Sequence, residues 1–101
     1  MPWFLVDRDL PRTTPEGLVA LQHAEELMGR RLAAAGYTVR YIRSIFVLGE
    51  SRCLCLFEAA DEDLVAQLND AAGLPYTRIV EVLDLDPPRL SVETLPGSPD
   101  L

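Results

Sequence analysis

The feature that most constrains the fold is the alternation of two hydrophobic periods along the chain. The stretch "WFLVDRD" is aromatic and β-branched in its first half, whereas "TTPEGLVALQHAEELMGRRLAAAG" repeats apolar residues every three or four positions. The first pattern predicts a strand at about residues 2–9 and the second a helix at about 15–35. Thr14 before Pro15 fits a helix N-cap, and Gly36 fits the left-handed residue that follows a helix.

The rest of the chain predicts three further strands and one further helix. "YTVRYIRSIFVL" and "RCLCLFEA" flank the turn "GES" and predict a hairpin at about 38–47 and 52–58. "DEDLVAQLNDAAG" predicts a helix at about 61–72, and "YTRIVEVLDL" a last strand at about 76–85. The order β-α-β-β-α-β predicts an α+β, ferredoxin-like fold, with a four-stranded antiparallel sheet that carries both helices on one face.

Length and charge exclude several classes of protein. The 101 residues fit one domain at 1–86, followed by a proline-rich tail at 87–101 that is either disordered or adds an edge strand to a partner subunit. No apolar run approaches the roughly 18 residues of a membrane span, and no basic segment precedes the first apolar run, so we expect a cytoplasmic protein without a membrane partner. All nine basic residues are scattered arginines and the net charge is −7, which argues against nucleic acid as a partner.

Side chains alternate along strands, so the sequence also predicts which residues share each face of the sheet. The face beneath the helices is predicted to carry Phe4, Val6, Ile42, Phe46, Cys53, Cys55, Phe57, Val80 and Val82. The opposite face is predicted to carry Trp3, Leu5, Asp7, Val39, Tyr41, Arg43, Ile45, Leu54, Leu56, Glu58, Ile79, Glu81 and Leu83. A shifted register of the second strand would exchange Arg43 with Ser44.

The opposite face is too apolar to meet water, yet it contains charges that a dry core does not accept unpaired. We therefore expect it to pair with a second copy of the chain, in a homodimer that encloses a cavity with polar groups. The residues predicted to line this ligand pocket are Trp3, Asp7, Tyr41, Arg43, Glu58 and Glu81. Two interpretations stay open for the charged members: a network that fixes the dimer register, and a binding site whose groups have shifted pKa values.

The two cysteines and the single histidine are the other candidate ligands. Cys53 and Cys55 point to one side of a strand and could hold a soft metal or act in redox exchange, but the favoured interpretation is that they are buried core residues beside Phe57. A zinc site requires two further ligands at a recognisable spacing, and none is visible. His23 has Glu26 three residues on, yet it lies away from the apolar stripe of its helix and is predicted to be solvated.

Several stretches together resemble a known family. They are "FLVDRDLP", "GLVALQHA", "VRYIRSIFVLGESRCLCLFEA" and "AAGLPYTRIVEVLDL", and they cover about residues 3–85. The chain is similar in them to a family of small bacterial proteins that form a domain of unknown function, and some members are described as nickel-binding. The resemblance implies a ferredoxin-like fold that pairs as a dimeric α+β barrel.

The resemblance implies nickel only weakly. Nickel-binding members are richer in histidine, with histidines soon after the first strand and along the helices. This chain has Asp7, Arg8 and Asp9 after its first strand and one histidine in total, so the imidazole ligands that nickel favours are nearly all missing. We therefore expect no metal and no cofactor. Cys55 aligns with a cysteine of the family, which does not by itself make it a ligand.

Three hypotheses for function follow. The first is a small binding protein whose dimer cavity accepts a small molecule or, with less support, a divalent metal such as nickel. The second is a cofactor-free monooxygenase, isomerase or cyclase acting on an apolar substrate, with Trp3 and Tyr41 lining it and Asp7 or Glu81 as the base. The third is a structural dimer without a ligand.

Overall fold

The structure is a computed structural model that describes residues 1–85. Its elements in chain order are β1 (Trp3–Asp9), α1 (Pro15–Ala34), β2 (Val39–Val47), β3 (Arg52–Ala59), α2 (Glu62–Ala71) and β4 (Arg78–Val82). The predicted order of strands and helices is confirmed, although β4 is shorter than expected. The tail predicted at 87–101 lies outside the described residues.

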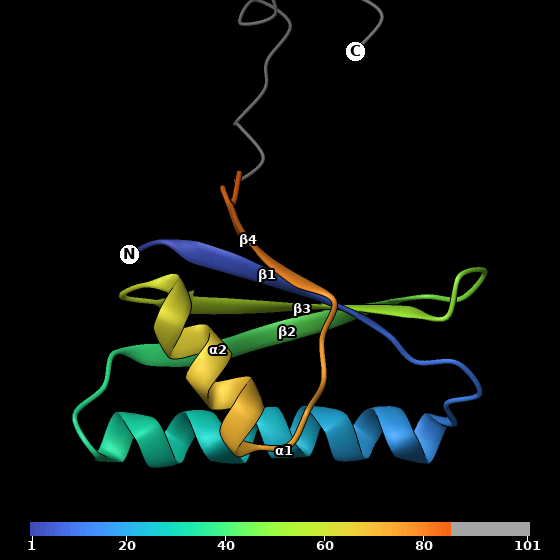
Figure 1. Cartoon of the computed structure of the whole chain (residues 1–101), viewed down its shortest axis with the longest axis horizontal. Helices are drawn as coiled ribbons and strands as arrows, with labels where there is room; N and C mark the ends of the chain where they lie inside the picture. Colours follow the sequence, from blue (N-terminus) through green and yellow to red (C-terminus); the bar gives the residue numbers. More distant parts are fainter. Residues whose placement is uncertain (86–101) are drawn as a thin grey trace, which may run out of the picture.

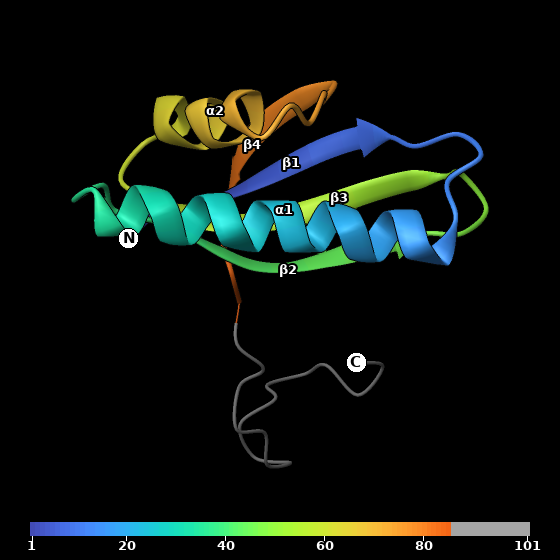
Figure 2. The same ribbon diagram turned by 90° about the horizontal axis from the view of Figure 1, so that it is seen from below.

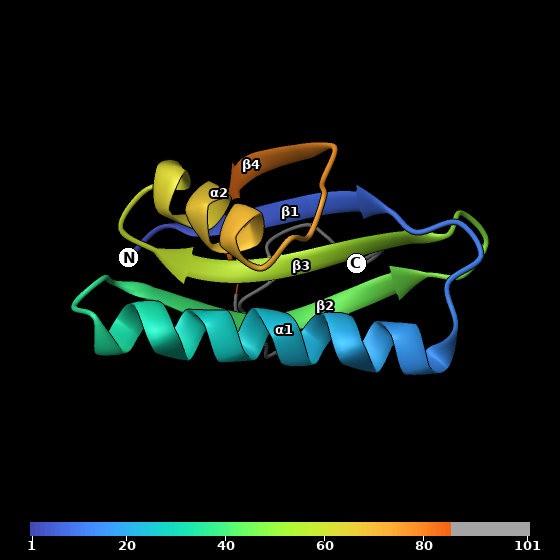
Figure 3. The same cartoon turned by 60° about the horizontal axis from the view of Figure 1, so that its bottom comes forward.

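The four strands form one antiparallel sheet in the order β2-β3-β1-β4 (Figure 1). Both helices lie on the same face of this sheet, and α1 runs along β2 (Figures 2 and 3). The predicted ferredoxin-like fold is therefore confirmed. No described helix or strand covers the other face. None of the helices in residues 1–85 is long and apolar enough to cross a membrane.

Local signals fix the ends of both helices. Thr14 Oγ1 accepts a hydrogen bond of 3.0 Å from the backbone N–H of Gly17, and Asp61 Oδ1 accepts one of 2.9 Å from Leu64. Each bond satisfies one of the backbone donors that the first turn of a helix leaves free. Gly36 and Gly73 follow the two helices with φ values of 98° and 70°, the left-handed region that glycine adopts without strain.

The core lies between the helices and the sheet. Its buried apolar residues are Phe4, Val6, Leu21, Val39, Cys53, Cys55, Phe57, Ala59, Leu64, Val65 and Leu68. The predictions for β1 and β3 are confirmed, since every second residue of these strands points beneath the helices. Both cysteines are free thiols within this core.

A β-bulge in β2 overturns part of the predicted faces. Tyr41 lies opposite Phe57, yet Arg43 lies opposite Leu56, so Ile42 is an extra residue that reverses the alternation along the strand. Tyr41 therefore belongs to the helix face, where its ring packs 5.4 Å from that of Phe57. The predictions that Val39 and Tyr41 lie on the uncovered face are wrong. Ser44 also lies on the helix face, and Arg43 stays on the uncovered one as first predicted.

The predicted faces of β4 are wrong as well. Ile79 lies opposite Val6 and points to the helix side, whereas Val80 lies opposite Leu5 on the uncovered face. By the same alternation Val82 is uncovered, and Glu81 points to the helix side. The physical reason is that both faces of "RIVEVL" carry apolar residues, so alternation alone does not set the side of this edge strand.

Candidate functional site

The uncovered face of the sheet retains four of the six residues predicted for the pocket. They are Trp3, Asp7, Arg43 and Glu58, which pair across strands with one another or with other residues of that face. The remaining two, Tyr41 and Glu81, lie on the helix side. The structure thus divides the predicted pocket between the two sides of the sheet.

Asp7 is paired within its own chain, by residues that the sequence analysis did not single out. Its Oδ2 accepts a bond of 2.7 Å from Arg52 Nη2, and Arg78 Nε lies 3.5 Å away. The hydrogen bond from Arg52 lowers the pKa of Asp7, against the effect of desolvation, so the carboxylate stays ionised at neutral pH. Only 5% of Asp7 is exposed even though no described element covers this face, because the two arginines cover it.

The other two charged residues of the face differ from each other. Glu58 accepts hydrogen bonds from Arg40 Nε and Nη2, the shorter being 2.9 Å, and this contact lowers its pKa. Arg43 is exposed and forms no ion pair with any carboxylate of residues 1–85. The predicted network of Asp7, Arg43, Glu58 and Glu81 therefore does not form within one chain.

Apolar side chains occupy the middle of the same face. The half-buried ones are Trp3, Leu5, Leu54, Leu56, Val80 and Val82. Ile45, also on this face, is 51% exposed. Together with Arg43 these residues form what we call the uncovered patch. It presents a largely apolar surface, and the carboxylates beside it, those of Asp7 and Glu58, are paired with arginines of the same chain.

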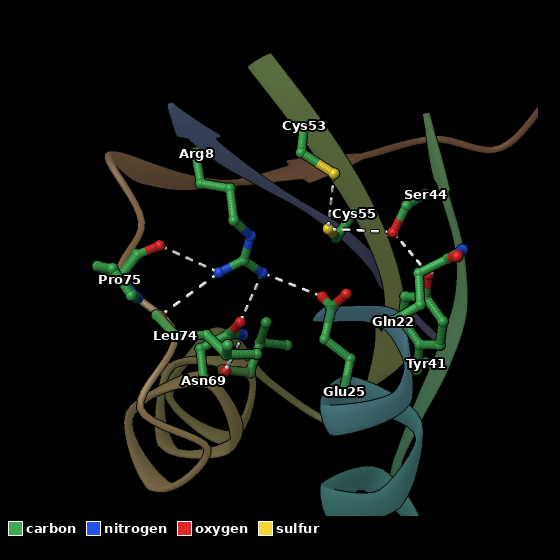
Figure 4. A network of polar contacts seen from close by, with 11 residues as sticks. Arg8, Gln22, Glu25, Tyr41, Ser44, Cys53, Cys55, Asn69, Leu74 and Pro75 are labelled. Carbon is green, nitrogen blue, oxygen red and sulfur yellow. Dashed lines mark hydrogen bonds and ion pairs between the residues drawn. The ribbon is translucent and has the colours of Figure 1, made fainter. Parts of the chain in front are cut away.

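A second polar cluster, which the sequence analysis missed, lies beneath the helices (Figure 4). At its centre is Arg8, 1% exposed, whose Nη2 donates to Glu25 Oε2 at 3.0 Å and to Asn69 Oδ1 at 2.7 Å. Its Nη1 donates to the carbonyl oxygens of Leu74 and Pro75 at 3.4 and 3.1 Å. A single side chain from β1 thus binds α1, α2 and the loop before β4.

Glu25 is completely buried, and burial raises its pKa to about 9, helped by Cys55 and opposed by Arg8. The carboxyl group therefore stays largely protonated at neutral pH. Its second oxygen, Oε1, has no hydrogen-bond partner within the described chain. Figure 4 shows the carboxyl group turned toward Cys55.

The thiols continue this cluster toward β2. Cys53 Sγ and Cys55 Sγ lie 3.7 Å apart, and Ser44 Oγ donates to Cys55 Sγ at 3.1 Å. Tyr41 bonds the hydroxyl of Ser44 and accepts a bond of 3.2 Å from Gln22 Nε2. A cavity of about 110 Å³ adjoins this end of the cluster, lined by Leu18, Gln22, Ser44, Phe46 and Cys53.

One signal in the sequence could have revealed part of this cluster. Glu25 occupies a position of the apolar stripe of its helix, four residues after Leu21, so its burial was readable from the helical period. A buried acid needs a partner, and Arg8 alternates with Phe4 and Val6 on the core face of its strand. Asn69 carried no comparable signal.

A nickel centre does not fit the residues present. Within residues 1–85, no group of three or more His, Cys, Asp or Glu side chains comes close enough to hold a metal ion. His23 is exposed on α1, as predicted. The donor set that suits nickel, with several imidazoles, is absent because the sequence has only this one histidine.

Comparisons with known proteins agree with the fold. The crystal structure of SCO4226 from Streptomyces coelicolor A3(2) superposes with a TM-score of 0.70 over 82% of this chain and 99% of that chain, at 18% sequence identity. No curated protein matches the sequence. The sequence model described as nickel responsive protein SCO4226-like matches residues 4–82, which contain all six strands and helices apart from Trp3, the first residue of β1. The chain therefore belongs to the SCO4226-like family of nickel responsive proteins.

Proposed function

We propose that the chain is a small binding protein of the cytoplasm that acts as a homodimer, joined through the uncovered patch, and that holds a small molecule between its two sheets. The observation that carries this proposal is the uncovered patch itself. Its apolar side chains, such as Leu56 on the central strand β3, have no described cover. Apolar surface of this kind gains free energy when a second sheet removes it from water.

The charges around the patch also support burial. Asp7 and Glu58 are already paired with arginines of their own chain, so covering them does not leave a carboxylate without a partner. Arg43 is the exception, since it is free of ion pairs within residues 1–85. In a cavity between two sheets, its guanidinium would bind an acidic group of a ligand or a carboxylate of the second copy.

The enzyme hypothesis gains no support from the geometry. It required Trp3 and Tyr41 to line one substrate, but the two residues lie on opposite faces of the sheet. The lowered pKa of Asp7 also makes this carboxylate a weak base. Nickel is the ion that the family name suggests, and we do not propose it as a resident ion here because the ligand set does not fit.

Native mass spectrometry of the protein as purified tests the proposal, because one spectrum reports the number of chains, any metal and any retained ligand. We expect a mass of two chains with a small organic molecule retained and without stoichiometric nickel after nickel is added. Arg43→Ala should lose the ligand or weaken the dimer, whereas Arg31→Ala, a matched change on the exposed side of α1, should do neither. A mass of one chain at micromolar concentration would rule out the proposed cavity between two sheets. Tight one-to-one uptake of nickel would overturn our assessment of the ligand set.

A further inference from the structure

The outer edge of β2 has no partner among the strands of residues 1–85. β2 stands at one end of the strand order β2-β3-β1-β4, and its nine residues make it the longest strand of the sheet. The outer side of an edge strand presents backbone N–H and C=O groups that no neighbouring strand bonds, and natural proteins usually cover or pair such an edge. This edge therefore has the backbone chemistry to accept an extended segment as a further strand.

A cleft beside this edge offers apolar contacts. Its volume is about 270 Å³, and its walls include Gly29 and Ala33 of α1 together with Val39 and Tyr41 of β2. Because side chains alternate along a strand, a strand added to β2 would direct every second side chain toward α1 and this cleft. The segment that fits therefore has apolar residues at alternate positions.

The charges of β2 select the other face of that segment. The strand carries Arg40 and Arg43 and no acidic residue. Arg43 lies on the uncovered face of the sheet, and it forms no ion pair with a carboxylate of residues 1–85. An acidic residue on the same face of an added strand would supply the missing partner.

The sequence that follows β4 has both properties. The stretch "RLSVETL" at 89–95 lies between two prolines and contains neither proline nor glycine, which is typical of a strand. In an extended conformation, Leu90 and Val92 fall on one side of it and Glu93 on the other. The match to the family ends at residue 82, so this extension is not part of the shared domain.

The proposed dimer brings this segment to the second copy. β4 ends at Val82, in the same row of the sheet as Arg40, so β2 of the same chain is three strand spacings or about 14 Å away across the uncovered patch. In the dimer, the second sheet covers that path. Two packed sheets lie only about 10 Å apart, and a two-fold axis parallel to the strands would place β4 of one chain against β2 of the other. Residues 83–88 span up to about 20 Å, so the segment that begins at residue 89 reaches that edge.

We propose that residues 89–95 of each chain add a strand to the β2 edge of the second copy, with Leu90 and Val92 facing its α1 and with Glu93 paired with Arg43 of the partner subunit. The inference rests on the proposed homodimer, and it names the carboxylate of the second copy that Arg43 binds. Backbone hydrogen bonds along β2 then join the two chains in addition to the uncovered patch.

Carbodiimide coupling tests the pairing, because this reagent joins an amine to a carboxylate that already forms an ion pair with it. The chain contains no lysine, so Arg43→Lys introduces a single side-chain amine. Labelled and unlabelled chains of this variant are mixed and allowed to exchange. We expect mass spectrometry to show an amide between positions 43 and 93 in peptides that combine a labelled and an unlabelled chain. Arg31→Lys, on the exposed side of α1, should not couple to Glu93.

Sedimentation velocity measures the same pairing without a cross-link. Glu93→Arg should raise the dissociation constant of the dimer about tenfold, because two exposed ion pairs are lost per dimer. Adding Arg43→Glu to this variant should restore most of the affinity, whereas Asp100→Arg, the same change of charge outside the segment, should leave the constant unchanged. A wild-type dimer that couples at position 43 only within one chain, or not at all to Glu93, would overturn this inference and leave the proposed dimer standing. A monomeric wild-type protein would overturn both.

Discussion

The guanidinium of Arg8 lies 3.0 Å from the carboxyl group of Glu25, and their side chains are 1% and 0% exposed. Arg8 belongs to β1 and Glu25 to α1, so a polar contact joins sheet and helix at the centre of an otherwise apolar layer. Asn69 of α2 accepts a second bond from the same nitrogen and donates its own amide to the carbonyl of Val65. One arginine of the sheet therefore forms hydrogen bonds with both helices.

Replacing Arg8 by methionine should destabilise the fold strongly. The change keeps much of the buried volume but leaves Glu25 Oε2, Asn69 Oδ1 and the carbonyl of Pro75 without their donor. Each buried acceptor that loses its donor costs about 1–3 kcal/mol. We expect a decrease of this size in the free energy of unfolding, measured by urea denaturation.

The matched control is Arg30→Met on the surface of α1, the helix that carries Glu25. Arg30 pairs with Glu26 at 3.0 Å, but its side chain is 78% exposed. An exposed pair at this helical spacing is worth about 0.3–0.5 kcal/mol. Equal losses in the two variants would show that the buried cluster does not stabilise the fold.

The stability of the protein should fall as the pH rises. Glu25 holds its proton up to about pH 9 in the folded protein, whereas the same group ionises at its ordinary pKa of 4.5 when the chain unfolds. Between these values the folded state binds more protons, so the free energy of unfolding decreases by at most about 1.4 kcal/mol per pH unit. The contribution is complete below the lower value and is lost as the pH passes the higher one.

Urea denaturation between about pH 5 and pH 8 measures this slope. Asp7 does not disturb the measurement, since its pKa is lowered from 3.8 and its contribution is lost only in more acidic solution. Glu25→Gln keeps an oxygen acceptor for Arg8 and removes the titration, so it should flatten the slope. A slope that persists in this variant would assign the effect to another group.

The sequence was sufficient for the order of elements because each local signal agreed with the next. The caps at Thr14 and Asp61 and the glycines after both helices fixed the helix ends, and the even alternation of "RCLCLFEA" fixed the faces of β3. The prediction failed at Tyr41 because the bulge at Ile42 depends on pairing with β3, which no local pattern in β2 reveals.

The ion pairs of Asp7 are a second feature that could not be predicted from the sequence. Arg52 and Arg78 lie 45 and 71 residues from Asp7 in the chain, and only the register of the sheet brings them to its carboxylate. The alternation of side chains predicted the correct face for Asp7, but it did not indicate which of the nine arginines pairs with this carboxylate. Side-chain pairing of this kind follows from tertiary contacts and not from local periodicity.

Gly29 provides a test of packing between the helices and the sheet. A Cβ atom at this buried position of α1 would lie 3.7 Å from both Leu68 Cδ1 and the backbone nitrogen of Tyr41, which is ordinary contact distance. Gly29→Ala should therefore raise the free energy of unfolding by about 0.5–1 kcal/mol, because alanine loses less backbone entropy in a helix. Gly36→Ala should do the reverse, since that residue has a φ of 98°. Loss of stability in Gly29→Ala would mean that the layer is packed more tightly than described.

A charge at the centre of the uncovered patch should dissociate the proposed dimer. Leu56 lies on β3 between Leu5 and Arg43, where a second sheet would cover it. In Leu56→Glu the new carboxylate meets water in the monomer but is desolvated in the dimer, so the dissociation constant should rise by about a hundredfold, which is about 2.7 kcal/mol. Sedimentation velocity over a dilution series measures this constant.

Leu48→Glu makes the same chemical change outside the patch, in the β2–β3 turn, where the leucine is 86% exposed. We expect this variant to remain a dimer with the wild-type constant, because its side chain meets water in both states. Circular dichroism of both variants separates loss of the dimer from loss of the fold. If Leu56→Glu stays folded and keeps the wild-type dissociation constant, the chains associate through another surface, because even a carboxylate paired with the adjacent Arg43 would be desolvated between two sheets.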